Sequence, residues 1–206
     1  MDRNIQILDH YLPPEAAPVI ATWINRYQVE LKISKSRQTK LGDYRAPFQG
    51  KPHRISINHN LNPYSFLITL IHEFAHLTCW NVHQFKVKPH GEEWKQEFKK
   101  LMMPWIENNF FPKEIQHGLL GYMQNPAASS CTDLHLMRVL EKFDFVKHDQ
   151  YSLETLAPGT IFQIKDGRIF IKGEKLRKRY RCMEKKTKRV YLFNPLTKVY
   201  LDINLD

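Results

Sequence analysis

Two histidines and a glutamate lie within five residues of one another, in the sequence His72-Glu73-Phe74-Ala75-His76. On a helix, residues four positions apart share one face, so His72 and His76 can both direct an imidazole at one metal ion. Zinc held in this way lowers the pKa of water towards neutrality, and Glu73 is placed to take the proton. The pentapeptide therefore predicts a hydrolytic zinc site with His72 and His76 as ligands and Glu73 as the catalytic residue.

The flanking sequence predicts that this pentapeptide lies on a long helix. Asn62 is a favourable N-cap, and Pro63 suits the first helical position, where its missing N–H is not needed. The stretch 64–80 contains neither glycine nor proline, and its apolar residues recur at helical spacing: Phe66, Leu67, Leu70, Ile71, Phe74 and Leu77. Core histidines are the simpler interpretation, but removing two imidazoles and a carboxylate from water without a metal would be costly. The metal interpretation is therefore favoured.

A catalytic zinc ion needs a third protein ligand and leaves its fourth position open. The downstream candidates are His83, His90, Glu92, Glu93 and Glu97. His90 is favoured because Pro89 indicates a loop before it and an amphipathic helix begins directly after it, which would hold its side chain rigidly. We therefore predict one zinc ion per chain, bound by His72, His76 and His90, with Glu97 as the alternative third ligand.

The motifs around this site resemble those of the SprT-like zinc metallopeptidases. The segment His90-Gly91-Glu92-Glu93-Trp94 begins fourteen residues after His76 and is similar to the HGxxF/W-type element that supplies the family's third histidine. The segments 37–45 and 54–58 also resemble the family's approach to its active site. The resemblance covers roughly residues 5–105. It implies a zincin-like fold and metal-dependent hydrolysis of peptide bonds in protein substrates.

The carboxyl-terminal region departs from the family pattern. Bacterial relatives often end in a zinc ribbon made from two cysteine pairs, whereas the three cysteines here are isolated: Cys79, Cys131 and Cys182. No cysteine follows Cys182, so a second, structural zinc ion is not expected. Short aromatic and β-branched stretches, joined by turns such as Lys165-Asp166-Gly167, instead predict an antiparallel meander that resembles a zinc ribbon but is held by packing.

Together these elements predict an α+β protein. Its core would be zincin-like, with helices packed on a small mixed sheet and the HExxH motif on the active-site helix. We expect residues 1–112 to form this core, residues 113–157 a connecting segment of helix and loop, and residues 158–206 a basic β-rich subdomain. Within the core, the strand 54–58 is expected to be an edge with which an extended substrate pairs through its main chain.

Positive charge is concentrated near the carboxyl terminus. The formal net charge is +10, and residues 161–190 carry twelve lysines or arginines against three acidic residues, a balance of +9. Solvated faces normally mix both signs, so a surface of one sign interleaved with aromatic residues favours nucleic-acid contact over acidic protein or a membrane surface. The predicted contact residues are Lys172, Lys175, Arg177, Lys178, Arg179, Arg181, Lys185, Lys186, Lys188 and Arg189.

The resemblance also bears on partners. Relatives of the SprT-like group include DNA-dependent proteases that degrade proteins crosslinked to DNA, which implies, with the basic region, a DNA-associated peptidase. Few and widely spaced cysteines predict a reducing compartment. Without a recognisable targeting signal or an apolar stretch of membrane length, we expect a cytoplasmic protein that does not contact the membrane.

Two other functions fit the same motifs. The chain could be a nucleic-acid-binding or regulatory protein with a structural zinc ion and no catalysis, although such a site would have no use for Glu73. It could also be a gluzincin-type peptidase that cleaves a regulator and uses Glu97 as its third ligand. Replacement of Glu73 separates the first alternative from an enzyme, and replacement of His90 or Glu97 separates the second.

Overall fold

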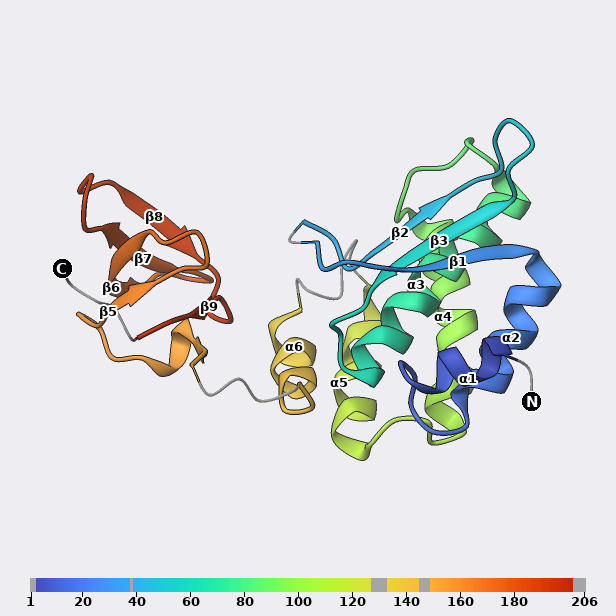
Figure 1. The fold of residues 1–206 in the computed structure, drawn as a ribbon, viewed down its shortest axis with the longest axis horizontal. Helices are drawn as coiled ribbons and strands as arrows, with labels where there is room; N and C mark the ends of the chain where they lie inside the picture. Colours follow the sequence, from blue (N-terminus) through green and yellow to red (C-terminus); the bar gives the residue numbers. More distant parts are fainter. Residues whose placement is uncertain (1–2, 38, 127–132, 145–148, 202–206) are drawn as a thin grey trace. The chain divides into compact units, whose positions relative to one another are not determined.

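The computed structural model describes residues 3–37, 39–126, 133–144 and 149–201 (Figure 1). The chain divides into two compact units, residues 1–144 and residues 145–206. This division differs from the expected boundaries at 112 and 157. The helices between residues 113 and 144 bury Ile115, Leu119 and Leu136 in the core of the first unit, so the expected connecting segment belongs largely to that unit.

The first unit is an α+β arrangement, as expected from the sequence. Its described elements, in chain order, are α1 (Arg3–Asp9), α2 (Ala16–Tyr27), β1 (Val29–Ser34), β2 (Gly42–Arg45), β3 (His53–Asn58), α3 (Pro63–His83), α4 (Glu92–Glu107), α5 (Lys113–Gln124) and α6 (Leu134–Glu141). None of the helices in the described part of the chain has the length and hydropathy needed to cross a bilayer.

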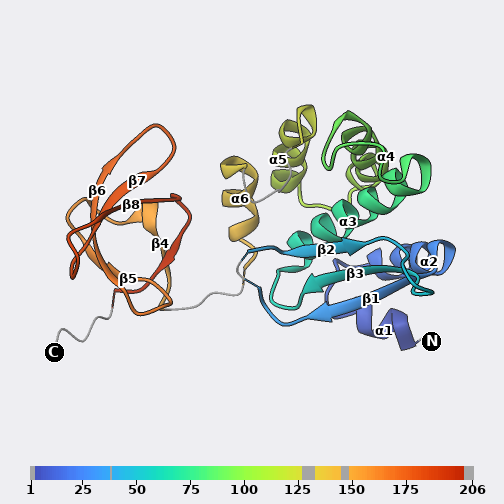
Figure 2. The same ribbon diagram turned by 90° about the horizontal axis from the view of Figure 1, so that it is seen from above.

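The three strands form a mixed sheet in the order β1-β3-β2, which Figure 2 shows from above. β1 pairs with β3 in parallel, from Val29↔His53 to Ser34↔Asn58. β2 pairs with β3 in the antiparallel sense, from Gly42↔Ile57 to Arg45↔Arg54. The expectation that the strand 54–58 is an edge was therefore wrong: both of its sides are occupied by neighbouring strands, and β2 is an edge instead.

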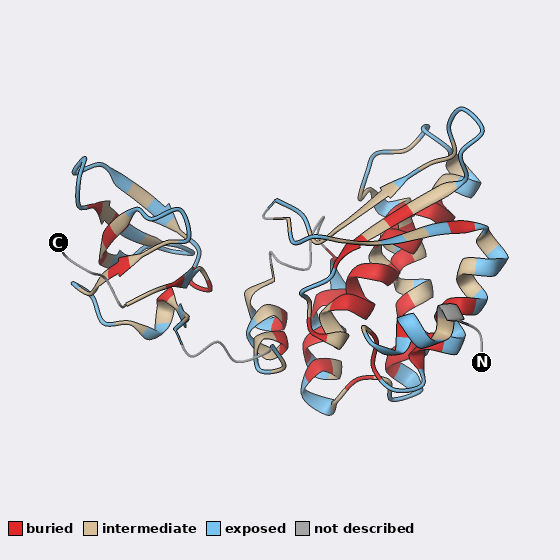
Figure 3. Cartoon of the chain, in the orientation of Figure 1, coloured by how far each residue is buried: buried red, intermediate tan, exposed pale blue. Residues whose placement is uncertain are grey.

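Helix α3 is the centre of the first unit. Its N-cap is Asn62, whose side chain accepts a hydrogen bond from the backbone N–H of Ser65 at 2.9 Å, and Pro63 follows as expected. The helix lies between the sheet and α4, and Figure 3 shows it buried along most of its length. Phe66, Leu70 and other apolar side chains of α3 are fully buried, so its position is set by packing on several sides.

The second unit is a small β structure. Its elements are β4 (Tyr151–Ser152), a 3-10 turn η2 (Leu153–Thr155), β5 (Ile161–Gln163), β6 (Ile169–Lys175), β7 (Tyr180–Glu184), β8 (Val190–Phe193) and β9 (Lys198–Val199). Strands β5 to β8 form an antiparallel meander in sequence order, whereas β9 pairs with β4. Phe162, Phe170 and Cys182 lie in its core.

Candidate metal centre

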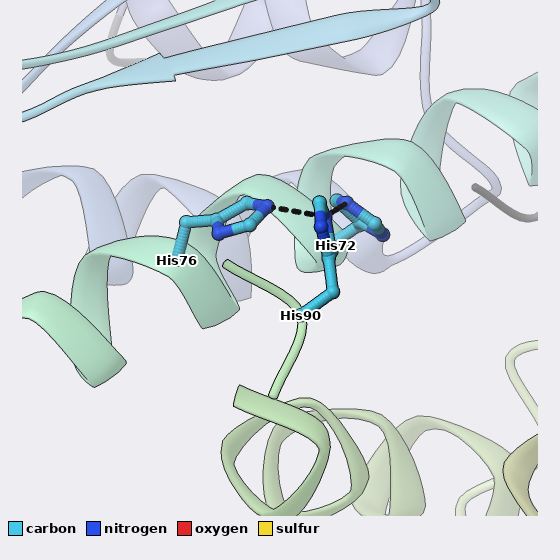
Figure 4. Close-up of side chains that lie close together, drawn as sticks. All are labelled: His72, His76 and His90. Carbon is cyan, nitrogen blue, oxygen red and sulfur yellow. Dashed lines mark hydrogen bonds between the residues drawn. The ribbon is translucent and has the colours of Figure 1, made fainter. Parts of the chain in front are cut away.

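The three histidines singled out in the sequence converge in the structure. His72 and His76 lie one turn apart on α3, and His90 reaches them from the loop that precedes α4 (Figure 4). The Nε2 atom of His90 is 3.2 Å from that of His72 and 2.9 Å from that of His76. Three ring nitrogens from two separate segments therefore point towards one small region of space.

The loop before α4 places His90 through an unusual backbone conformation. His90 has a φ of 58°, in the left-handed region that non-glycine residues seldom adopt. The next residue, Gly91, donates its N–H to the carbonyl of Lys88 at 2.9 Å and begins α4 as its N-cap. Strained backbone of this kind persists where the surrounding structure holds it, often at functional sites. Here the conformation turns the imidazole towards α3.

Trp94 supports all three imidazoles at once. Its ring centroid lies 4.6 Å from that of His72, 5.3 Å from that of His76 and 4.7 Å from that of His90. Only 1% of this tryptophan is exposed, and it stacks on Phe98 below. In the sequence, Trp94 stood out as the last residue of the family-like segment that begins at His90, and its contact with the ligands was not expected.

The cluster fits a tetrahedral zinc ion in spacing and in protonation. Zinc–nitrogen bonds of 2.0–2.1 Å place two ligand nitrogens roughly 3.3 Å apart, close to the observed separations. Burial, reinforced by the neighbouring histidines, lowers the pKa of His72 to about 3 and that of His76 to about 4. Burial also lowers the pKa of His90. All three rings are therefore neutral at pH 7 and offer the lone pairs that a metal requires.

Glu73 lies beside this cluster as a buried carboxyl group, with 6% of the residue exposed. Burial and the nearby carboxylate of Asp43 raise the pKa of Glu73 to about 8, whereas Arg37, Lys40 and a hydrogen bond from the backbone N–H of Tyr44 oppose the rise. A divalent cation at the histidines would also favour the charged carboxylate. Glu73 is thus held where its protonation can respond to a bound ion.

Gly42 is a site residue that the sequence reasoning did not single out. A Cβ atom built at this position of β2 would collide with Oε1 of Glu73 and lie 2.8 Å from both Glu73 Cγ and Thr69 Cγ2. The absent side chain therefore leaves the space that the glutamate occupies. The available signal was the glycine itself, which weakens a short strand unless something must approach its backbone closely.

Tyr44 contacts the cluster from the sheet side. Its ring is nearly parallel to that of His76, with centroids 6.3 Å apart, and its hydroxyl is 2.9 Å from Nδ1 of His53. Tyr44 and His90 both line a cleft of about 330 Å³ in front of the histidines, together with Lys40, Gly42, Asp43 and Glu73.

The alternative ligands do not join this group. Among the described residues, His72, His76 and His90 are the one group of potential ligands that could hold a metal ion. Glu97 instead lies 3.8 Å from the ammonium of Lys100. In the second unit, Cys182 is a buried free thiol, and Cys131 lies outside the described residues. The described structure therefore offers one metal site, without the alternative glutamate and without a second cysteine site.

Nine of the ten basic residues predicted to contact nucleic acid are exposed, and Lys172 is not. Only 2% of Lys172 is exposed. Its ammonium donates to the carbonyl oxygens of Leu156 and Glu154 and lies 4.1 Å from the ring centroid of Tyr180. The prediction was therefore wrong for this residue: Lys172 joins η2 to the meander from within and cannot reach a nucleic acid.

Helix α3 carries two histidines and a buried glutamate, and the loop before α4 adds a third histidine. This arrangement defines a potential three-histidine metal centre of the metallopeptidase type. Residues 18–117, which contain the whole cluster, match the family model described as the SprT-like family. The resemblance found in the sequence is confirmed over these residues. No curated protein and no solved structure gave a significant match.

Proposed function

We propose that the chain is a zinc-dependent peptidase with a zincin-like core. The observation that carries this proposal is the position of Glu73, buried beside three converging imidazoles at the wall of an open cleft. A purely structural zinc site has no need of a carboxylate that is not a ligand, and its four positions are closed by protein ligands. The family match supports the same class of activity.

The mechanism assigns separate tasks to the residues of the cleft. His72, His76 and His90 would hold the ion, which when bound supplies a Lewis acid that polarises the scissile carbonyl and lowers the pKa of water. Glu73 takes a proton from the attacking water and passes it to the departing amine as the carbon–nitrogen bond breaks. The backbone N–H of Tyr44 donates a hydrogen bond that orients the carboxylate of Glu73. Trp94 beneath the rings keeps the imidazoles in place.

Strand β2 is the surface along which we expect the substrate to lie. It is an edge of the described sheet, and Gly42, Asp43 and Tyr44 from this strand line the cleft in front of the histidines. An extended peptide can pair with such an edge through main-chain hydrogen bonds. Because the main chain is common to all peptides, this pairing requires an unfolded segment but does not require a particular sequence.

Cleavage of an unfolded protein by the zinc-loaded chain tests the proposal. The wild type should produce fragments, and Glu73→Gln should bind zinc equally while cleaving roughly 10²–10⁴-fold more slowly, the range for loss of a general base. Zinc content is measured by elemental analysis on the same samples. Equal cleavage by both proteins would show that Glu73 is not the base, and no cleavage by the zinc-loaded wild type would exclude the peptidase.

We also propose that the second unit contacts nucleic acid, through two groups of exposed basic residues. Arg177, Lys178 and Arg179 lie in the connection between β6 and β7, whereas Lys185, Lys186 and Lys188 lie in that between β7 and β8. These connections join opposite ends of β7, which are roughly 17 Å apart at the usual rise per residue. Lysines and arginines so spaced can contact separate phosphates of one backbone.

Two variants of equal charge change test this contact. In one, Arg177, Lys178 and Arg179 become alanine; in the other, Lys185, Lys186 and Lys188 do. We expect the first to weaken DNA binding, reduce its salt dependence and abolish stimulation of proteolysis by DNA, with zinc content unchanged. Fluorescence anisotropy with labelled DNA measures the binding. The role of residues 177–179 would be contradicted if DNA still stimulated proteolysis by the first variant. It would also be contradicted if only the second variant lost this stimulation.

A further inference from the structure

A second hollow, of about 320 Å³, adjoins the three-histidine cluster and does not include Glu73 in its lining. It shares Tyr44, His76 and His90 with the cleft described above. The rest of its wall is mainly apolar and comes from four parts of the chain: the residues after β2, the end of α3, the loop that leads to His90, and the first turn of α4. The apolar residues are Ala46, Trp80, Phe85, Val87, Pro89 and Trp94.

The rim of this hollow carries a large apolar side chain that the fold leaves in water. Phe85 is 84% exposed, and its ring meets that of Trp80 edge to face at 6.2 Å. Single exposed apolar residues are common on protein surfaces, but this one borders a hollow that opens beside potential metal ligands. Gln84 and Lys88 are the polar residues on the same loop that line the hollow.

Continuity with the cleft determines what can occupy the hollow. An atom beside His76 or His90 in the cleft is also beside the hollow, because both histidines line both spaces. A peptide bond that reacts at the cluster therefore carries its neighbouring side chains to the mouth of the hollow. The apolar wall favours a hydrocarbon or aromatic side chain there over a charged one.

From this geometry we propose that the hollow is a specificity pocket, which receives a large apolar side chain next to the bond that is cleaved. The inference rests on the proposed peptidase function and adds a substrate class to it: unfolded segments that contain leucine, phenylalanine or methionine. Main-chain pairing with β2 would hold the segment, and the pocket would select the position of the cut. Such segments are exposed when a protein loses its fold.

Cleavage-site mapping tests the pocket. Zinc-loaded wild type is incubated with a mixture of synthetic decapeptides, and the ends of the products are identified by mass spectrometry. We expect a large apolar residue at one fixed position beside the cut, with leucine preferred over alanine by about tenfold or more, as for a pocket that distinguishes side chains by size. If the apolar residue is enriched on the amino-terminal side of the cleaved bond, the substrate pairs with β2 in the antiparallel sense. If it is enriched on the carboxyl-terminal side, the pairing is parallel.

Three variants locate the preference on the structure. Ala46→Phe fills the hollow and should shift the preference towards small residues. Phe85→Ala removes part of the rim and should reduce the preference for leucine several-fold. Phe48→Ala is the matched control, because Phe48 is also exposed, at 64%, but does not line the hollow. It should leave the preference unchanged.

The outcomes separate this inference from the function on which it rests. Cleavage without any preference at a fixed position would overturn the pocket while leaving the peptidase intact. A preference that Ala46→Phe and Phe85→Ala do not alter would also overturn it, because the selecting surface would then lie elsewhere. No cleavage by the zinc-loaded wild type would overturn the peptidase, and the pocket with it.

Discussion

At the scale of single residues, the candidate site depends on side chains whose burial changes their chemistry. His72 and His76 are kept neutral by removal from water, and Glu73 is kept close to the pH at which it can exchange a proton. These are opposite shifts with one cause, since burial disfavours the charged form of any group. A cation at the cluster would satisfy both the lone pairs of the histidines and the charge of the glutamate.

The identity of the third ligand is the first prediction at this scale. His90→Ala should lose most bound zinc, because two histidines on one helix turn leave the ion without its third protein ligand. Glu97→Ala should retain about one zinc per chain, because Glu97 is not part of the cluster. Elemental analysis of the two variants beside the wild type measures this. Zinc loss in Glu97→Ala alone would identify a glutamate ligand instead.

Gly42→Ala should impair catalysis without removing the metal. The added Cβ would overlap the side chain of Glu73, which must then move away from the cleft wall. A displacement of about 1 Å can cost about 100-fold in rate, so we expect a loss of that order in kcat with zinc content unchanged. The control is Gly121→Ala in α5, where nothing lies within 4 Å of the added atom. Equal activity of both variants would contradict this role for Gly42.

At the scale of elements, the site combines one rigid helix with two less regular segments. Helix α3 supplies two histidines and the glutamate at positions set by helical geometry alone. Strand β2 and the loop before α4 supply Gly42, Tyr44 and His90, and their positions depend on packing against α3. The start of α3 therefore affects the geometry of the whole site.

Asn62 is the residue through which this element can be tested. Its side chain caps α3 and also donates to the carbonyl oxygen of Leu140 at 3.0 Å and to Asp144 at 2.6 Å, which joins α3 to α6. Asn62→Ala removes a cap and leaves a buried acceptor unpaired, at a cost of about 2–3 kcal/mol. Urea unfolding measures the change. Asn108→Ala, at the exposed end of α4, should change stability by less than about 0.5 kcal/mol; similar losses in both would contradict the proposed link.

At the scale of the whole molecule, the buried histidines link stability to pH when no metal is bound. Unfolded histidines titrate near pH 6.5, whereas folded His72 and His76 have a pKa of about 3 and about 4. At a pH between the folded and unfolded pKa values, the unfolded chain therefore binds more protons than the folded chain. Each histidine then lowers the free energy of unfolding by about 1.4 kcal/mol for each unit by which the pH falls. Glu73 acts in the opposite direction, since its folded pKa is raised to about 8.

We therefore expect the metal-free protein to lose stability as the pH falls from 6.5 to 5, because two histidines outweigh one carboxyl group. Urea unfolding in the presence of a chelator measures this at several pH values. His72→Gln should make the dependence shallower, and Glu73→Gln should make it steeper, each by about one proton, or about 1.4 kcal/mol per pH unit. Identical slopes in the three proteins would contradict the shifts assigned to these groups.

In its described part, the second unit is a small β structure with an aromatic core and one buried lysine. Phe162 and Phe170 stack at 5.7 Å in its core, and the buried ammonium of Lys172 bonds to carbonyl oxygens of the segment before β5. A buried lysine is stable only with such partners. The same contacts explain why a basic stretch of sequence does not form a wholly basic surface.

The sequence by itself determined the parts of the site that depend on local spacing. The helical period brought His72 and His76 to one face with Glu73 beside them, the cap at Asn62 located the start of the helix, and a loop followed by an amphipathic stretch indicated His90. The α+β class and the resemblance to the SprT-like family follow from the same local patterns. Each of these inferences uses residues close in the chain, whose relative positions are limited by backbone geometry.

Only the tertiary structure decided which strand is an edge, why residue 42 is a glycine, where Trp94 lies and which lysine is buried. It also revealed the apolar hollow beside the histidines, to which the end of β2 and the residues between Cys79 and Trp94 both contribute. These features depend on contacts between residues far apart in the chain. Strand order and burial are set by the packing of the whole unit, in which a strand of similar composition can lie in the middle of a sheet or at its edge.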